Sequence, residues 1–338
     1  MDITILGIES SCDDTSAAVI RNTTLLSNVI ASQAVHVKYG GVIPELASRA
    51  HQQNIIPVVD TALKEAGVSV DKLDAIAFTR GPGLLGSLLV GASFAKGLAV
   101  ACDIPLVEVN HLQGHILSHF IDLPGREMPH PDFPFLCLLV SGGHTQIVRV
   151  DSPLEMQIIG TTIDDAVGEA FDKVAKALGL GYPGGPIISK LAETGNPKAI
   201  DFPRALNSRG DYRFSLSGLK TAVTLYIEQE TKAGRTIHLP DLAASFEAAV
   251  FDVQYKKAKN ALHATGCKEY CIGGGVSANP HLREMMIKKL GRQGIRVTVP
   301  PLSACTDNAA MIAEVARRKF DRGEISPFDV DADPNMTL

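Results

Sequence analysis

Two histidines one helical turn apart are the residues of this chain whose types and spacing are best suited to chemistry. His111 and His115 lie four positions apart in NHLQGHILSHF (110–120), a segment that reads as a helix. Side chains at i and i+4 share a helix face, so both imidazoles can bind one metal ion. His119 continues the series, but it lies about 80° around the helix from His111, so the three histidines do not converge on one ion. The alternative is an ordinary helix surface.

A third metal ligand has to come from another segment, and Asp307 in CTDNAAM (305–311) is the candidate. It lies at the start of the last predicted helix, where it could instead cap the helix N-terminus. A zinc peptidase carries HExxH, with the glutamate as general base, but residue 112 is leucine here. The chain also has no GxSxG and no GxxxxGK[ST] motif. The pattern therefore indicates a metal site without indicating peptidase chemistry.

Three turns of small residues could bring the backbone close to an anion. Two of them, ESSCDDTS (9–16) and SGGHT (141–145), each join a first strand to a second strand. The third, GGGVSANPHL (273–282), joins a strand to a helix that Ser277 or Asn279 can cap. Its spacing is not GxGxxG, which excludes the Rossmann dinucleotide motif. Each turn could also be structural only.

Two aspartates lie in or beside these glycine-rich segments. Asp172 is near the middle of a predicted helix (164–178) that precedes GYPGGP (181–186). It could bind a ligand hydroxyl or could be an exposed helix residue. Asp13, in the first turn, is a candidate general base, but no side chain is assigned a catalytic role.

The elements that must position these residues follow a similar order in both halves. The first half predicts strands at 2–9, 16–21 and 24–32, then helix 44–66, strand 74–79, helix 84–101, strand 105–109 and the histidine helix. The second half predicts strands at 134–141, 145–150 and 155–160, helix 164–178, a loop-rich insertion at 201–215, helix 241–266, strand 269–274, a helix from 280, strand 295–299 and helix 307–322. We expect an α/β protein of two lobes with mixed β-sheets flanked by helices, and a ligand cleft between the lobes. Lobe one is 1–130, with the C-terminal helix 306–325 packing back on it, and lobe two is 131–305.

Composition limits the setting in which the protein works. The net charge of −5 over 338 residues means that RNA binding needs a local basic patch or a partner's charge. Candidate patches are KKAK (256–259), KKLGR (288–292) and ARRKF (316–320), each of which is typical of a solvated helix face. The six cysteines show no CxxC pairing, so we expect a reducing cytosol, and we interpret Cys267 and Cys271 as small core residues. The apolar run 81–95 is too short and glycine-rich to span a bilayer, so we expect no membrane association.

Long motifs along almost the whole chain resemble those of one family, the universal tRNA threonylcarbamoyladenosine transferases. That family has the actin-like (RNase H-like) ATPase-domain fold, and it was formerly described as a glycoprotein endopeptidase. The motifs are GIESSCDDT (7–15), GGVIPELASRAH (40–51), GPGLLGSLLVG (81–91), NHLQGH (110–115), LVSGGHTQ (139–146), DDAVGEAFDKVAKALGLGYPGGP (164–186), SLSGLKTA (215–222), GGGVSAN (273–279) and TDNAAMIA (306–313).

The resemblance implies a reaction and a metal. The threonylcarbamoyl group of threonylcarbamoyl-AMP passes to N6 of the adenosine 3′-adjacent to the anticodon, in tRNAs that read codons beginning with A, and AMP leaves. One divalent ion per subunit, Fe²⁺ or alternatively Zn²⁺, is implied on His111, His115 and Asp307. The implied substrate-binding residues are Leu139, Val140, Ser141, Gly142 and Gly143 for the phosphate and carbamoyl end, Asp172 and Gly185 for the ribose, and Asn279 for the adenosine side.

The implied partners are tRNA, threonylcarbamoyl-AMP, a smaller actin-like paralogue and a P-loop ATPase subunit, in the cytoplasm. Family members often carry glutamate where this chain has Gln113 and Asp14, neither of which is an implied metal ligand. The alternatives are an actin-like ATPase or small-molecule kinase, a non-catalytic paralogue of the same complex, and a peptidase. If the protein were a kinase, His111 and His115 would have no obvious role.

Overall fold

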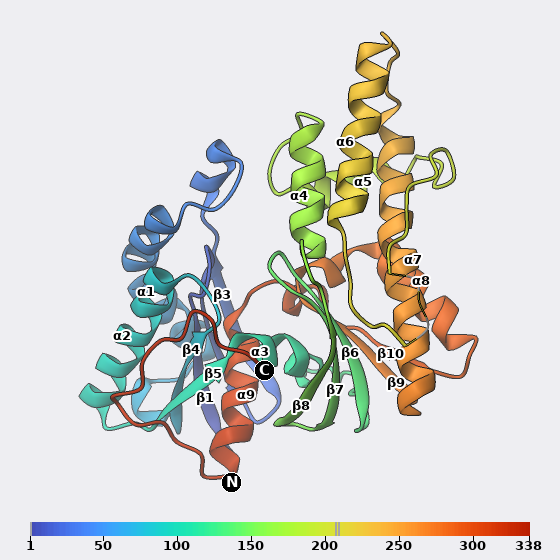
Figure 1. Ribbon diagram of the computed structural model, residues 1–338. Helices are drawn as coiled ribbons and strands as arrows, with labels where there is room; N and C mark the ends of the chain where they lie inside the picture. The colour runs from blue at the N-terminus through green and yellow to red at the C-terminus, as the bar shows by residue number, and fades with distance from the viewer. Residues whose placement is uncertain (1, 207, 209) are drawn as a thin grey trace. The chain divides into compact units, whose positions relative to one another are not determined.

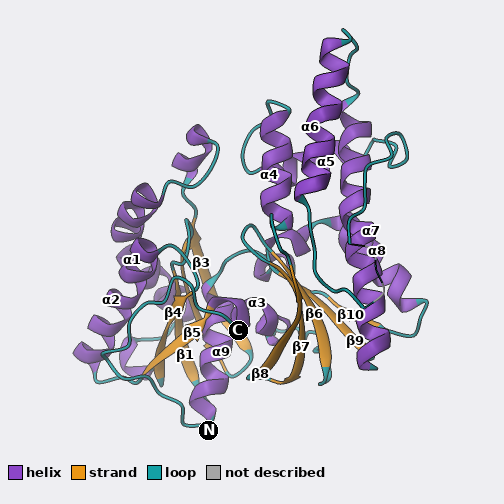
Figure 2. Ribbon diagram, in the orientation of Figure 1, coloured by secondary structure: helices purple, strands orange, loops and turns teal. Residues whose placement is uncertain are grey.

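Two five-stranded mixed β-sheets organise the chain in the computed structural model, which describes residues 2–206, 208 and 210–338 (Figure 1). Figure 2 shows that helices flank the sheets, which confirms the predicted α/β class. The first unit of the chain comprises Met1–Pro131, Ser152–Met156 and Pro300–Leu338, and the second comprises Asp132–Asp151 and Gln157–Val299. Residues 131, 152–156 and 300–305 therefore belong to the first unit, whereas the sequence pattern predicts them in the second lobe.

The first sheet has the strand order β3-β2-β1-β4-β5. Its strands are β1 (Thr4–Glu9), β2 (Thr15–Arg21), β3 (Thr24–Ala31), β4 (Ala75–Gly81) and β5 (Leu106–Asn110). The pairs β1–β2 and β2–β3 are antiparallel, whereas β1–β4 and β4–β5 are parallel. The carboxyl ends of β1, β4 and β5 therefore meet at one edge, where sheets of this kind commonly bind ligands.

Helices cover both faces of this sheet. They are α1 (Pro44–Ala66), α2 (Leu85–Cys102), α3 (His111–Leu117) and α9 (Ala309–Asp321). Leu6 and Ile8 of β1 share a core with α1 and α2, so Gly7 between them faces the opposite side. A Cβ on Gly7 would lie 2.4 Å from the carbonyl oxygen of Ala309, so the missing side chain allows α9 to pack against the strand backbone.

By length and apolar composition, α2 alone among the described helices meets the usual criterion for a membrane span, which core helices also meet. Its Leu88, Ala92, Ala95 and Ala99 are buried, and the last three belong to the core beneath α1. One face of α2 therefore packs in the core of the first unit, while other residues of the helix, such as Leu85 and Val100, are exposed.

The second sheet has the strand order β10-β9-β6-β7-β8. Its strands are β6 (Phe135–Val140), β7 (Thr145–Ser152), β8 (Glu155–Thr161), β9 (Glu269–Gly273) and β10 (Arg296–Thr298). The accompanying helices are α4 (Val167–Ala177), α5 (Gly184–Ala192), α6 (Ser217–Lys232), α7 (Leu239–Thr265) and α8 (Pro280–Gly291). Phe171 of α4 and Phe246 of α7 pack edge to face, with ring centroids 4.9 Å apart, in the core of this unit.

Parts of two predicted basic patches are built into the fold. Arg317 and Arg318 of α9 both pair with the fully buried Glu314, and Arg318 also lies over the ring of Phe120. Lys257 of α7 is buried and donates hydrogen bonds to two carbonyl oxygens of the 201–215 loop. A solvated helix face is therefore the wrong interpretation for these three side chains.

Candidate metal centre and ligand pocket

The first site is built around α3, which starts directly at the end of β5. The side chain of Asn110 accepts hydrogen bonds from the backbone N–H groups of Leu112 (2.8 Å) and Gln113 (3.3 Å), which caps the helix. This cap places His111 in the first turn. The rings of His111 and His115 lie edge to face, with centroids 4.7 Å apart. The predicted helix over 110–120 is confirmed for residues 111–117, after which a 3₁₀ turn (Ser118–Phe120) carries His119.

Asp307 lies beside the two histidines, although it comes from the C-terminal segment of the first unit, Pro300–Leu338. Its Oδ1 lies 3.1 Å from Nε2 of His115 and 3.5 Å from Nε2 of His111. The three candidate ligand atoms all lie within 4.8 Å of one another. Asn308, and not Asp307, caps α9 by accepting from the N–H of Met311, so the alternative role offered by the sequence is wrong.

A buried carboxylate contacts the ring of His111 at Nδ1. Oε2 of Glu9, the last residue of β1, lies 3.0 Å from Nδ1 of His111. Glu9 is 1% exposed. Burial opposes its ionisation, but the contact with His111 outweighs burial and lowers the pKa of Glu9. Burial likewise lowers the pKa of His111, yet the carboxylates of Glu9 and Asp307 raise it to about 9. The sequence motif contains Glu9, but no spacing rule points to this contact.

The donor set fits the implied divalent ion. Two imidazoles and one carboxylate are ligands that both Zn²⁺ and Fe²⁺ accept. Three protein ligands leave positions open for an oxygen of a substrate, as catalytic sites require. The side chain of Asp307 is 29% exposed, so the site is accessible from solvent.

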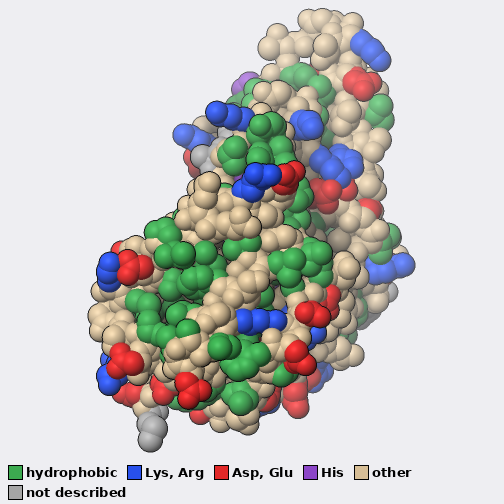
Figure 3. All heavy atoms as spheres, turned by 90° about the vertical axis from the view of Figure 1, so that its left-hand side faces the viewer, with side chains coloured by type: hydrophobic (Ala, Val, Ile, Leu, Met, Phe, Trp, Pro, Cys, Tyr) green, Lys and Arg blue, Asp and Glu red, His purple; other side chains and the backbone are tan. Residues whose placement is uncertain are grey.

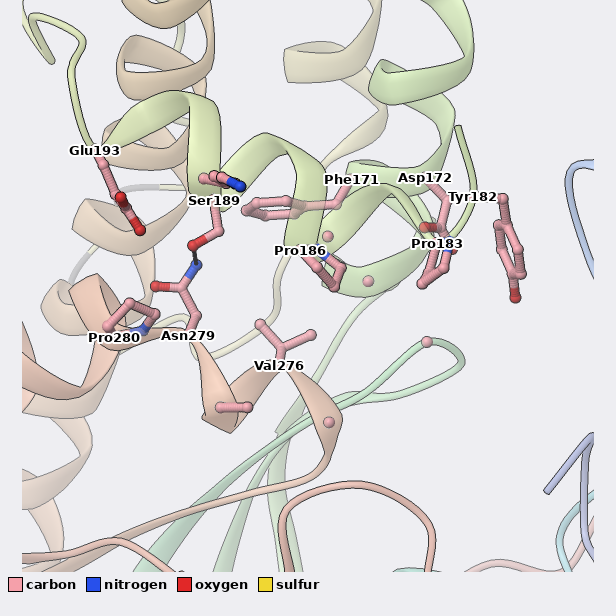
Figure 4. Close-up of a pocket in the computed structure, with 16 residues that line it drawn as sticks. Phe171, Asp172, Tyr182, Pro183, Pro186, Ser189, Glu193, Val276, Asn279 and Pro280 are labelled. Atoms are coloured by element: carbon pink, nitrogen blue, oxygen red, sulfur yellow. Dashed lines mark hydrogen bonds between the residues drawn. The ribbon is translucent and has the colours of Figure 1, made fainter. Parts of the chain in front are cut away.

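The second site is a cavity of about 520 Å³ within the second unit (Figure 4). Four of the predicted substrate-binding residues line it, namely Gly142, Asp172, Gly185 and Asn279. Its apolar lining includes Phe171, Tyr182, Pro183 and Val276. The cavity therefore combines flat apolar surfaces with a few polar groups, as small-molecule sites commonly do.

Asp172 shapes the pocket as well as lining it. Its carboxylate accepts a hydrogen bond from the N–H of Gly184 (2.7 Å), at the start of α5. Burial raises the pKa of Asp172. Its side chain is only partly buried, and it lines the cavity. A Cβ on Gly184 would lie 2.8 Å from Cα of Asp172, whereas a Cβ on Gly185 meets nothing within 4 Å. Asp172 is therefore half-buried and not the exposed helix residue that the sequence left open.

Asn279 is held by a buried acid that the sequence did not single out. Its side-chain oxygen caps α8 by accepting from the N–H of Leu282 (3.0 Å). Its amide donates to Glu247 of α7 (2.5 Å) and to Ser189 of α5 (3.2 Å). Glu247 also contacts Nδ1 of His281, and burial raises the pKa of Glu247. The predicted cap on α8 is confirmed.

The remaining predicted site residues lie beside the pocket or outside it. Leu139 and Val140 are fully buried in β6, and they are not among the residues that line the cavity. Ser141 and Gly143 lie in the β6–β7 turn next to Gly142. Asp13 lies in the β1–β2 turn of the first unit. Roles for these residues stay predictions.

Comparison with known proteins gives consistent matches over the chain. Residues 24–314 match the family described as tRNA N6-adenosine threonylcarbamoyltransferase. A protein of that name from Porphyromonas gingivalis is 56% identical over 97% of this chain and 96% of its own length. Another from Phocaeicola vulgatus is 53% identical over 100% of both.

Solved structures support the fold alone. Full-length HypF in a phosphate- and nucleotide-bound form superposes with a TM-score of 0.60 at 15% identity, over 96% of this chain and 47% of that one. HypF from T. kodakarensis gives a TM-score of 0.61 at 13% identity, over 96% and 48% of the two chains.

Proposed function

The chain belongs to the tRNA N6-adenosine threonylcarbamoyltransferase family, and from this premise we propose that a metal centre in its first unit and an adenylate pocket in its second serve the reaction. The enzyme transfers the threonylcarbamoyl group from threonylcarbamoyl-AMP to N6 of the adenosine 3′-adjacent to the anticodon, in tRNAs reading codons that begin with A. The bond from N6 to the carbamoyl carbon forms, the bond from that carbon to the phosphate oxygen breaks, N6 loses a proton, and AMP leaves.

The chemistry explains why the enzyme needs both sites. The N6 lone pair is delocalised into the adenine ring, so this amine is a weak nucleophile and the acyl group has to be activated. A divalent ion, Fe²⁺ or Zn²⁺, supplies Lewis-acid polarisation of an oxygen on the reacting group. We propose that His111, His115 and Asp307 hold it. The observation that carries this proposal is the convergence of the three ligand atoms within 4.8 Å, although Asp307 is 192 residues from His115.

We propose that the pocket of the second unit binds the adenosine part of threonylcarbamoyl-AMP. Phe171 and Val276 offer apolar surfaces for the base, and the half-buried carboxylate of Asp172 can accept from a ribose hydroxyl. Gly142 and Gly185 lack side chains, so a ligand can approach their backbone closely. The pocket's size and its Asp172 carboxylate support this assignment.

A transfer assay with a chelator tests the proposal. Threonine labelled in threonylcarbamoyl-AMP should appear on unmodified tRNA when this chain and its protein partners are present. Chelator treatment followed by buffer exchange should remove most transfer, and added Fe²⁺ or Zn²⁺ should restore it, because the ligand set binds such ions reversibly. Full transfer by protein shown by elemental analysis to be metal-free would overturn the metal proposal. Phosphorylation of a small molecule without tRNA would favour the kinase alternative.

We also propose that a smaller actin-like paralogue and a P-loop ATPase subunit act with this chain in the cytoplasm, and that the paralogue docks on α1 and α2. These helices expose the apolar side chains of Ile56, Leu85, Leu89 and Val100. The three side chains of α2 fall within about 60° of one another around the helix, so they form one face. Figure 3, viewed from this side of the first unit, shows apolar side chains gathered there. An exposed apolar face of this kind suits a partner that has matching helices.

Charge placed on this face should prevent the complex from forming. We expect Leu89→Glu to abolish co-elution with the paralogue in size-exclusion chromatography, because a buried unpaired carboxylate is costly. Leu225→Glu on α6 is a matched control, since the two leucines are 47% and 49% exposed. Unchanged co-elution of the Leu89→Glu protein, or its loss in the control, would place the interface elsewhere.

A further inference from the structure

Glu9 stands behind the proposed metal ligands and has no assigned task. It ends β1, at the edge where the parallel strands β4 and β5 also end. Thr79 of β4 lies beside it, and His111 follows β5 directly. Three neighbouring strands therefore bring a carboxylate, a hydroxyl and an imidazole together at one sheet edge.

The carboxylate of Glu9 is held from three directions. Its Oε1 accepts from the backbone N–H of Ser11 (2.5 Å), and its Oε2 accepts from the hydroxyl of Thr79 (2.6 Å). The same Oε2 lies 3.0 Å from Nδ1 of His111. All of these partners are at most 8% exposed, so bulk water does not compete for the contacts. Three contacts thus fix the position of the Glu9 carboxylate as a hydrogen-bond acceptor.

A fixed acceptor at Nδ1 selects one form of the imidazole. With its proton on Nδ1, His111 donates to Glu9 and keeps the lone pair on Nε2. That Nε2 is the atom that faces Asp307, at 3.5 Å from its Oδ1. Nδ1 of His115, by contrast, has no hydrogen-bond partner among the described residues. The two histidines are therefore positioned differently, His115 by packing and His111 by a carboxylate.

The charge of Glu9 is a second reason to expect that it strengthens metal binding. Two neutral imidazoles and Asp307 together carry one negative charge, whereas a divalent ion carries two positive charges. Glu9 supplies a second negative charge without occupying a ligand position, which leaves open positions for substrate oxygens. Carboxylates that accept from the far nitrogen of a metal-binding histidine typically strengthen metal binding by about 10- to 100-fold.

We propose that Glu9 is a positioning residue that orients His111, fixes its tautomer and raises the affinity of the centre for divalent metal. This inference rests on the proposed metal centre. Ser11 offers the competing explanation, because its hydroxyl oxygen lies 3.2 Å from the same Nδ1. A hydrogen bond to an ionised acceptor is stronger than one to a hydroxyl, which favours Glu9.

Zn²⁺ affinity, measured by competition with a chromogenic chelator, tests the inference on the full chain. Glu9→Gln keeps the shape but removes the charge, and we expect about 10- to 100-fold weaker Zn²⁺ binding. Thr79→Val loosens Glu9 without touching His111, so it should weaken binding by a smaller factor. Ser11→Ala should leave the affinity within about twofold of the unaltered protein. Nitrogen NMR of the Zn²⁺-loaded protein, in which a ligating His111 is neutral, should show that Glu9→Gln weakens the hydrogen bond donated by Nδ1–H of His111, which a merely structural role would not change.

The outcomes separate this inference from the proposal on which it rests. If the unaltered chain does not bind Zn²⁺, or His115→Ala binds it equally well, the metal centre itself is wrong. If His115→Ala loses the metal but Glu9→Gln and Thr79→Val bind it normally, the centre stands and the role of Glu9 is overturned. Weak binding by Ser11→Ala with normal binding by Glu9→Gln would assign the task to Ser11. Thermal unfolding of each variant identifies any that fail to fold, and Thr79→Val then decides.

Discussion

Asp307→Asn is expected to remove at least about 99% of threonylcarbamoyl transfer at limiting metal and to weaken Zn²⁺ binding by more than about 100-fold. Loss of a residue that only hydrogen-bonds to a metal ligand typically weakens metal binding by about 10- to 100-fold. Loss of a ligand itself should therefore weaken binding by more than that. The amide keeps the volume of the side chain but lacks the negative charge that faces Nε2 of both histidines. Metal content by elemental analysis and transfer onto unmodified tRNA are the two measurements.

The control for this variant is Asp201→Asn, which makes the same change at a fully exposed position of the second unit. It should leave metal content and transfer unchanged. Thermal unfolding should also show little change for Asp307→Asn, since Asn308 and not Asp307 caps α9. Normal metal content in Asp307→Asn would rule this carboxylate out as a ligand.

Gly185→Val is expected to block the adenylate pocket while leaving the fold intact. Gly185 lines the cavity, and a Cβ at this position meets nothing within 4 Å. The valine side chain would therefore take space that the ligand needs. Overfilling a fitted site costs about 1–3 kcal/mol, which corresponds to about 5- to 150-fold weaker binding. Calorimetry with AMP measures the loss, and KM for threonylcarbamoyl-AMP should rise in parallel.

Two other glycines make this test specific. Gly218→Val, at the start of α6, also meets open space but lies outside the cavity, so AMP binding should be unchanged. Gly184→Ala should instead lower the thermal stability, because its Cβ would lie 2.6 Å from Cβ of Ala175. AMP binding by Gly185→Val at the affinity of the unaltered chain would show that the adenosine lies elsewhere.

The sequence was sufficient for the elements and for part of each site. Hydrophobic periodicity located the strands and the helices around His111, and the i, i+4 spacing correctly predicted that the two imidazoles lie together. Asp307 was a candidate ligand from its residue type and its place at the start of a helix, but its contact with His115 could not be predicted, because a contact between residues 192 positions apart leaves no local pattern. The expected location of a ligand between the lobes stays a prediction.

The buried residues that hydrogen-bond to the site residues could not be predicted from the sequence. Glu9 and Glu247 are buried, and their roles depend on side chains from distant strands and helices. A single glutamate in a strand or helix has no spacing that distinguishes it from a surface residue. Asp172 was ambiguous for the same reason, since only the packing of α4 against α5 shows that its carboxylate is half-buried.

The first unit is made from both ends of the chain, and this sets an order of events during synthesis. All of Gln157–Val299 leaves the ribosome before α9 does, so the second unit is complete earlier. Asp307 lies 192 positions after His115, and its synthesis follows that of His115 by on the order of 10–40 s. During that interval α9 is absent from the face of β1 at Gly7, and the two histidines lack Asp307. The proposed metal centre therefore gains its third ligand only after residue 307 has been synthesised, and a chain terminated before that residue would carry two of the three proposed ligands.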